Sequence, residues 1–74
     1  MNNVNCEIVL KNEHSITVNN FNCVEYRLES DDKMRMFKKE DIESLDLIDD
    51  ITYTIIGATI VKIKGEQILY FHFK

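Results

Sequence analysis

The sequence predicts an all-β, or β-dominant, fold: a small barrel or roll of about six short antiparallel strands with one short helical turn near residues 40–45. Residues 51–73 are rich in β-branched and aromatic side chains, and residues 51–61 carry no charge. The rest of the chain contains short alternating apolar and polar runs separated by Asn, Asp and Ser turns. With 74 residues, 45% hydrophobic and 30% charged, the chain forms a single domain over residues 1–74. An SH3-like roll and a compact sandwich both fit this pattern.

The first two strands are expected at residues 6–11 and 15–18, where apolar residues alternate with polar ones. A loop of three residues, 12–14, pairs Leu10 with Ile16 and keeps the apolar side chains of both strands on one face. A two-residue loop would place a serine opposite Leu10 and break that face. The three-residue loop is therefore the preferred prediction.

A second hairpin is expected from residues 23–29 and 33–37, after a turn or bulge at Asn19-Asn20. A three-residue loop between these strands keeps their apolar positions together. It also sets Arg27 opposite Arg35, which costs free energy unless neighbouring glutamates screen the two charges.

Residues 38–50 break the strand pattern. The apolar residues that recur there at helical spacing are Ile42, Leu45 and Ile48. This spacing predicts a short helix or 3₁₀ turn around residues 40–45, which must dock on the sheet because it is too short to be stable alone. A strand over residues 44–48 is the competing interpretation. Asp49-Asp50 is expected to form the next turn.

The last strands are expected near residues 51–56, 58–64 and 67–73. Gly57 allows a bend between the first two. Gly65 suits the first central position of a two-residue type II′ hairpin, which would pair Ile63 with Ile68. A three-residue loop would shift that register by one, and the pattern does not decide between them. In both cases this hairpin has more apolar surface than a one-sided sheet requires.

Composition excludes some functions. The net charge of −4 and a pI near 5.0 argue against attraction of the whole surface to nucleic acid or anionic membranes. We expect a cytoplasmic protein that does not contact membranes, because the N-terminus is unlike a secretory signal and no apolar run approaches about 20 residues. Cys6 and Cys23 would then be reduced thiols. A chain rich in Asn, Ile, Lys and Asp, without Pro or Trp, indicates an AT-rich bacterial or phage genome.

The sequence predicts no enzyme, no cofactor and no metal site. The residues best suited to bind a metal are Cys6, His14, Cys23 and His72. Their separations match no paired zinc pattern, and no local signal supports a catalytic cysteine–histidine pair. Two glycines are too few for a phosphate-binding loop, and the acidic pairs lack the spacing of a calcium loop.

An acidic segment is the first candidate surface for binding another protein. Its acids are Glu40, Asp41, Glu43, Asp46, Asp49 and Asp50. The surplus apolar face of the last strand adds Ile68, Tyr70 and His72. A solvated helix face is the simpler explanation of the acids. The leading hypothesis is nevertheless a non-enzymatic interaction protein, such as a phage or mobile-element factor that binds and modulates or inhibits a host protein.

A basic cluster supports the alternative, a small β-barrel protein that binds nucleic acid. Its residues are Lys33, Arg35, Phe37, Lys38 and Lys39. Lys62 and Lys64 would join them if the sheet closes. The same lysines also fit a sheet edge guarded against unwanted pairing. A homo-oligomeric structural or ligand-sequestering protein is the third hypothesis.

Overall fold

This computed structural model describes residues 4–27, 33–45 and 47–74, without the side chains of residues 43 and 44. Its strands are antiparallel, as the sequence predicts, and they form two sheets. The strands in these ranges are β1 (Cys6–Leu10), β2 (Ser15–Val18), β3 (Cys23–Arg27), β4 (Met34–Phe37), β5 (Thr52–Ile56), β6 (Ile60–Lys64) and β7 (Ile68–Phe73). Two short 3₁₀ helices, η1 (Lys39–Ser44) and η2 (Gly65–Gln67), connect them. The all-β prediction and the helical turn near residues 40–45 are confirmed.

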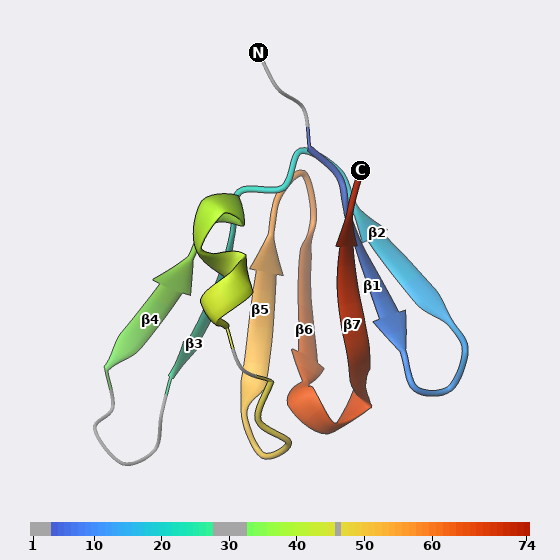
Figure 1. The fold of residues 1–74 in the computed structure, drawn as a ribbon, viewed down its shortest axis with the longest axis vertical. Coiled ribbons are helices and arrows are strands. Elements are labelled where there is room, and N and C mark those ends of the chain that lie inside the picture. Colours follow the sequence, from blue (N-terminus) through green and yellow to red (C-terminus); the bar gives the residue numbers. More distant parts are fainter. Residues whose placement is uncertain (1–3, 28–32, 46) are drawn as a thin grey trace.

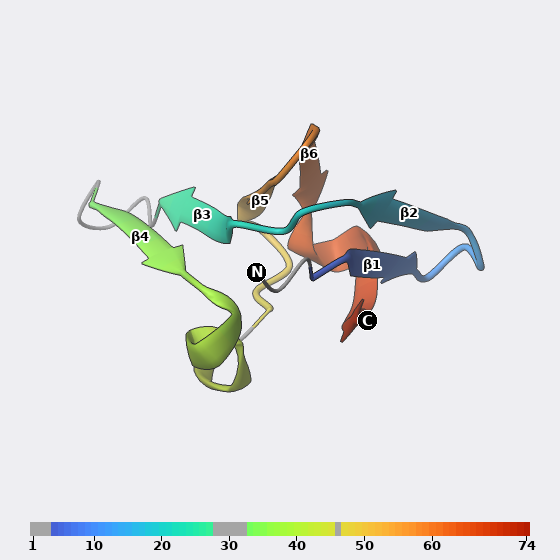
Figure 2. The same cartoon turned by 90° about the horizontal axis from the view of Figure 1, so that it is seen from above.

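The strands follow the order β2-β1-β7 in one sheet and β4-β3-β5-β6 in the other (Figure 1). The chain passes between the sheets twice, from β2 to β3 and through η2 from β6 to β7. Seen from above, η1 lies to one side of the four-stranded sheet (Figure 2). The two ends of the described chain meet, because the Asn5 and Lys74 backbones exchange hydrogen bonds of 3.2 and 2.9 Å.

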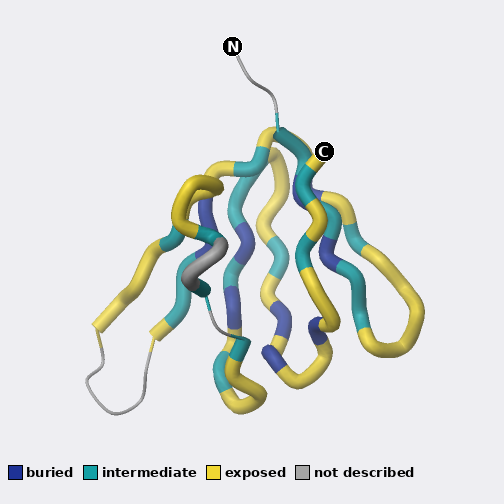
Figure 3. The backbone as a smooth tube through the Cα atoms, in the orientation of Figure 1, coloured by how far each residue is buried: buried dark blue, intermediate teal, exposed yellow. Residues whose placement is uncertain are grey.

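The core lies between the two sheets and η1. Its buried residues are Cys6, Ile8, Val18, Val24, Tyr53, Ile55, Ile63 and Ile68. The side chains of Ile42, Leu45 and Leu47 pack against this core from η1 and the segment after it. The Ile48 backbone N–H donates a 2.8 Å hydrogen bond to the Tyr53 hydroxyl, which anchors that segment. Figure 3 shows buried positions on the central strands and exposure along most of β4.

The first hairpin keeps the predicted apolar face in a different register. Ile8 lies opposite Ile16, whereas the prediction paired Ile16 with Leu10. A shift of two residues leaves the same side chains on the same face. The turn lies one residue earlier than predicted: the Leu10 N–H donates to the His14 carbonyl at 2.8 Å, the Glu13 N–H donates to the Leu10 carbonyl at 3.1 Å, and Glu13 adopts a φ of 74°.

The second hairpin differs from the predicted register by one residue. Tyr26 lies opposite Arg35, and Arg27 opposite Met34, so the two arginines do not face each other. A slip of one residue exchanges the faces of a strand. The Phe37 ring therefore stacks on Tyr26, with ring centroids 5.7 Å apart, whereas the methionines of β4 point to the outer face of the sheet.

The predicted terminal hairpin is wrong. Within the described residues β6 and β7 do not pair; β7 instead pairs with β1. Gly65 begins η2 and has no positive φ, so it does not serve a type II′ turn. Its N–H donates to the Ile51 carbonyl at 2.8 Å, and a Cβ at this position would overlap the Ile48 carbonyl group. Glycine is required here because two backbone segments approach closely.

The turns predicted at Asn19-Asn20 and Asp49-Asp50 agree with the structure, whereas most of the loop predicted between residues 29 and 33 lies outside the described residues. Asn20 has a φ of 54°, as expected for an asparagine in a turn, and Asp49-Asp50 forms a turn before β5. Gly57 lies in the connection from β5 to β6, close to the Asn19 carbonyl oxygen. The competing strand over residues 44–48 is not formed at residues 45, 47 and 48, which the structure describes.

Candidate functional site

The four acids of the predicted acidic surface whose side chains the structure describes do not form one compact patch. Glu40 and Asp41 are exposed on η1, whereas Asp49 and Asp50 are exposed at the turn before β5. These two pairs lie toward opposite ends of the four-stranded sheet (Figure 1). The remaining predicted acids, Asp46 and the side chain of Glu43, lie outside the described residues. Since apolar residues between the pairs pack on the core, this segment also covers the inner face of the sheet.

Ile68 was expected on a surplus apolar face at the surface, and that placement is wrong. Its side chain is 2% exposed and belongs to the core. The reason is a β-bulge: Leu10 pairs with Ile68 but Val9 pairs with Tyr70, so Leu69 is an extra residue. The bulge changes the phase of alternation along β7. Ile68 therefore points inward, whereas Tyr70 is 50% exposed.

His72 is exposed but engaged within the chain. It lies opposite Glu7 in the pairing of β1 with β7, and its Nδ1 is 3.5 Å from Glu7 Oε1. The Nζ of Lys74 is 3.4 Å from the same oxygen. The hydrogen bond from His72, followed by the charge of Lys74, lowers the pKa of Glu7 below its usual range. These contacts give His72 a structural role in joining β1 and β7.

The predicted basic cluster lies on β4 and at its two ends. Its exposed basic residues are Lys33, Arg35, Lys38 and Lys39. Phe37 is half-buried and its ring stacks on Tyr26, so one ring face is covered where a nucleobase would stack. Lys62 and Lys64 do not join the cluster, because β6 lies at the opposite edge of the four-stranded sheet.

The outer face of the four-stranded sheet is a surface that the sequence did not reveal. Across it, Met36 lies opposite Glu25, Glu25 opposite Thr54, and Thr54 opposite Lys62. This row combines apolar, acidic, hydroxyl and basic side chains. Finding this surface requires the observed register of β4, because the predicted register places Met34 and Met36 on the inner face.

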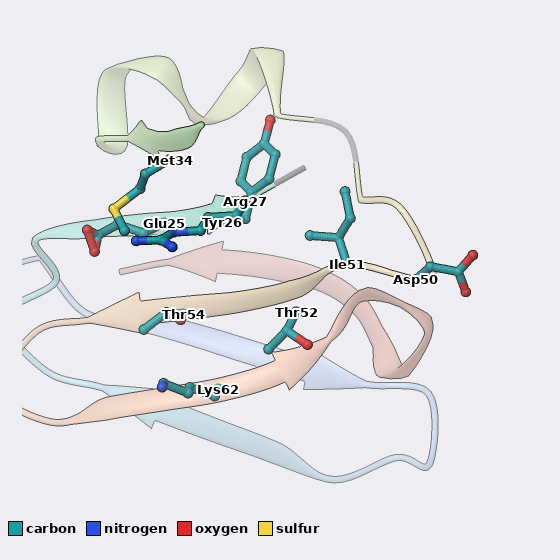
Figure 4. A pocket seen from close by; sticks show the side chains of 9 residues that line it. All are labelled: Glu25, Tyr26, Arg27, Met34, Asp50, Ile51, Thr52, Thr54 and Lys62. Carbon is teal, nitrogen blue, oxygen red and sulfur yellow. The ribbon is translucent and has the colours of Figure 1, made fainter. Parts of the chain in front are cut away.

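A shallow depression of about 460 Å³ lies beside this row, and Figure 4 shows its lining. Met34 reaches from β4 toward the Glu25 and Arg27 side chains of β3. Thr54 and Lys62 belong to the lining on β5 and β6. The lining combines charged and hydroxyl side chains with the flexible thioether of Met34.

Both cysteines are free thiols, and both are buried. Burial raises the pKa of Cys6 to about 12. Burial and the nearby Glu25 carboxylate also raise the pKa of Cys23, although Lys38 acts in the opposite direction. An activated cysteine nucleophile requires a lowered pKa, and neither thiol has one. In the part of the chain that the structure describes, no three potential ligands are grouped to hold a metal ion.

Comparisons with protein-family models, with curated proteins and with solved structures find no match for this chain. Among the described residues, neither 3₁₀ helix has the length and apolarity that crossing a bilayer requires. Function is therefore inferred from the arrangement of the residues themselves.

Proposed function

We propose that this protein is a non-enzymatic interaction domain that binds another protein, and β4 is the observation that carries the proposal. The strand lies at the end of the four-stranded sheet. Its two methionines, Met34 and Met36, are 54% and 56% exposed. Methionine is flexible and polarizable, and it is favoured where a surface must adapt to a partner.

The surface next to β4 supports the same proposal. Arg27 and Met34 line the depression on the outer face, and both residue types are enriched at protein interfaces. The depression is shallow and mixed in charge, which suits a docking surface better than an enclosed substrate site. The raised pKa of each cysteine thiol fits a role without covalent chemistry.

The nature of the partner belongs to the proposal as well. The amino-acid composition favours a phage or mobile-element origin, with a host protein as the target that is modulated or inhibited. The exposed acids Glu40 and Asp41 remain candidate contacts for a basic patch on that partner. Replacing both with lysine tests this contact: retention of the full partner affinity would remove the acidic surface from the proposal.

Nucleic-acid binding is the second candidate, because four basic residues lie on or beside one strand. Stacking of Phe37 on Tyr26 and the net charge of −4 count against it. Binding to single-stranded nucleic acid would weaken steeply as the salt concentration rises.

An affinity pull-down from a lysate of the source organism, with and without nuclease, tests the proposed function. A single protein that is retained after nuclease treatment, and that binds the purified domain directly in a titration, is the expected result. Loss of all captured material on nuclease treatment would replace the proposal with nucleic-acid binding. If nothing binds and the mass of the domain rises with its concentration, the domain is a self-assembling protein instead.

A further inference from the structure

Resting on the proposed function, we infer that the outer edge of β4 binds an extended acidic segment of the partner, which joins the four-stranded sheet as an additional strand. The segment alternates acidic and apolar residues. Its backbone pairs with β4, its acidic side chains lie near the basic residues of the edge, and its apolar side chains lie beside the methionines.

The backbone of β4 provides the template. β4 pairs with β3 on one side, and it is the terminal strand in the order β4-β3-β5-β6. In an antiparallel strand, every second residue directs its N–H and C=O groups away from the paired neighbour. Among the described strands only β3 pairs with β4, and a strand edge of this kind readily accepts another strand. The helix η1 lies over the inner side of the sheet rather than along the outer edge of β4 (Figures 1 and 2).

The side chains of β4 leave this edge accessible. Met34, Arg35 and Met36 are all exposed, and only Phe37 is half-buried. By contrast β2, the edge strand at the far end of the other sheet, is uncharged from Ser15 to Val18. It therefore offers no charge with which to select a partner. Selection by charge is available at β4.

Charge decides which occupant fits. Residues 33–39 contain four basic residues and no acidic one. Pairing of β4 with β4 of a second copy would bring two basic edges together, and like charges on neighbouring strands are destabilising. An acidic strand replaces that repulsion with attraction, which also speeds association. The complementary occupant is therefore an acidic extended segment rather than another copy of this chain.

The two faces of β4 define the alternation. Arg35 lies opposite Tyr26 on the inner-face side of the sheet, whereas Met34 and Met36 lie on the outer face. Side chains of an added strand alternate in the same way. Acidic residues at every second position would lie beside Arg35, and the apolar residues between them would extend the methionine surface toward the depression.

The probe is a capped, fluorescent peptide in which glutamate and valine alternate over about eight residues, long enough to pair along β4. Binding to the purified protein is measured by anisotropy. Two control peptides accompany it: one with lysine in place of glutamate, and one with the same glutamates and valines in two blocks. We expect binding of the alternating acidic peptide alone. Equal binding of the block peptide would show that charge, and not strand pairing, is recognised, and would overturn the inference.

A matched pair of protein variants locates the site. Replacing Lys38 and Lys39 with glutamate reverses two charges at the end of β4. Replacing Lys11 and Lys64 with glutamate makes the same change in net charge at exposed positions on the β1–β2 connection and on β6. The first variant is expected to weaken peptide binding by at least about fivefold, and the second by less than about twofold. Equal weakening in both variants would mean that net charge alone is sensed.

Two N-methylated forms of the peptide test backbone pairing without changing the protein. One form carries N-methyl groups on the glutamates and the other on the valines. Because an added strand pairs through only one of its two edges, one form should lose binding and the other should keep it. Equal affinities for both forms would overturn the inference.

Failure of this inference can be told apart from failure of the proposed function. If a protein partner binds the domain directly and the two charge-reversal variants bind it equally well, the proposed function stands and the site on β4 is wrong. If no protein binds, the proposed function fails first. Nuclease-sensitive capture, or dimers that form through β4, would also overturn the inference, because the occupant would be a nucleic acid or a second copy.

Discussion

The two strands β4 and β7 each end a sheet, but the structure uses them in opposite ways. β7 reads ILYFHF and is the more apolar, yet its Ile68 is buried and Phe71 and Phe73 are half-buried against the core. β4 reads MRMF and carries a charge, yet both of its methionines are more than half exposed. Hydrophobicity alone therefore does not distinguish an exposed edge strand from one packed against the core.

The register of each strand and its neighbouring elements determine which side chains of β4 and β7 are buried. The bulge at Leu69 lets β7 direct Ile68 inward and then keep both phenylalanines on the inner side. In the β3–β4 hairpin, Phe37 stacks on Tyr26 on the inner face. This register places Met34 and Met36 on the outer face. We therefore expect substitutions in β7 to affect stability and substitutions in β4 to affect binding.

The largest effect is expected at Ile68 in β7. Replacing it with alanine leaves a cavity in the core and should lower the free energy of unfolding by about 2–5 kcal/mol. Leu69→Ala is the matched control, because Leu69 is 55% exposed, and it should cost less than about 1 kcal/mol. Urea denaturation measures both variants. Equal losses would contradict the phase change that the bulge assigns to β7.

Gly65→Ala tests the connection that carries the chain to β7. The added Cβ would lie only 2.8 Å from the Ile48 carbonyl carbon, so two backbone segments must separate. We expect a loss of about 1–3 kcal/mol in the free energy of unfolding. Gln67→Ala, at an exposed position of the same 3₁₀ helix, is the control and should change the stability little. An unchanged denaturation midpoint for Gly65→Ala would show that the close approach is not required.

Replacing both Met34 and Met36 with serine tests the proposed role of β4 in binding. Stability should change by less than about 1 kcal/mol, because both side chains are exposed. The affinity for the alternating glutamate–valine peptide should fall about tenfold, since the apolar contacts at β4 are lost. Ile60→Ser, which removes a 64% exposed side chain from the opposite edge of the sheet, is the control. An unchanged peptide affinity in the double variant would show that the two methionines do not contribute to binding.

The smallest expected effect is a pH dependence at Glu7, which joins β1 to β7. Its lowered pKa means that the ionised carboxylate favours the folded state, so the contribution to stability is present above its ordinary pKa and is lost as the pH falls through the lowered value. Glu7→Gln should lower the thermal midpoint at neutral pH and converge with the parent protein in acid. If the difference in thermal midpoint between Glu7→Gln and the parent protein stayed constant from neutral to acid pH, the contacts of Glu7 with His72 and Lys74 could not be its cause.

Much of the fold followed from local patterns. The β-branched and aromatic run predicts strands close to those observed at β5, β6 and β7, and apolar spacing predicts the turn at η1. The turn at Asn19-Asn20 followed from residue type, and Asn20 indeed adopts a positive φ. These features depend on neighbours in the sequence, which is why the sequence alone was sufficient.

The pairing of distant strands did not follow from the sequence. The registers predicted for the first two hairpins differ from the structure, and the predicted third hairpin does not form. The first shift goes with a local turn in which Glu13 adopts a positive φ. The stacking of Phe37, the bulge at Leu69 and the close approach at Gly65 are contacts between segments that loop length does not reveal. The candidate site depends on these registers. Its basic residues were identified from the sequence, but the exposure of Met34 and the burial of Ile68 were not.

Hydrogen exchange by mass spectrometry, with and without the alternating glutamate–valine peptide, tests the central contrast most directly. Among the described strands, β4 and β7 each pair with one neighbour. In the free protein, β7 should exchange more slowly than β4, because Ile68, Phe71 and Phe73 pack in or against the core, whereas most side chains of β4 are exposed. The peptide should slow exchange in β4 and leave β7 unchanged. Protection that appears in β7 on adding the peptide, with none in β4, would contradict the assignment of β4 to binding and β7 to structure.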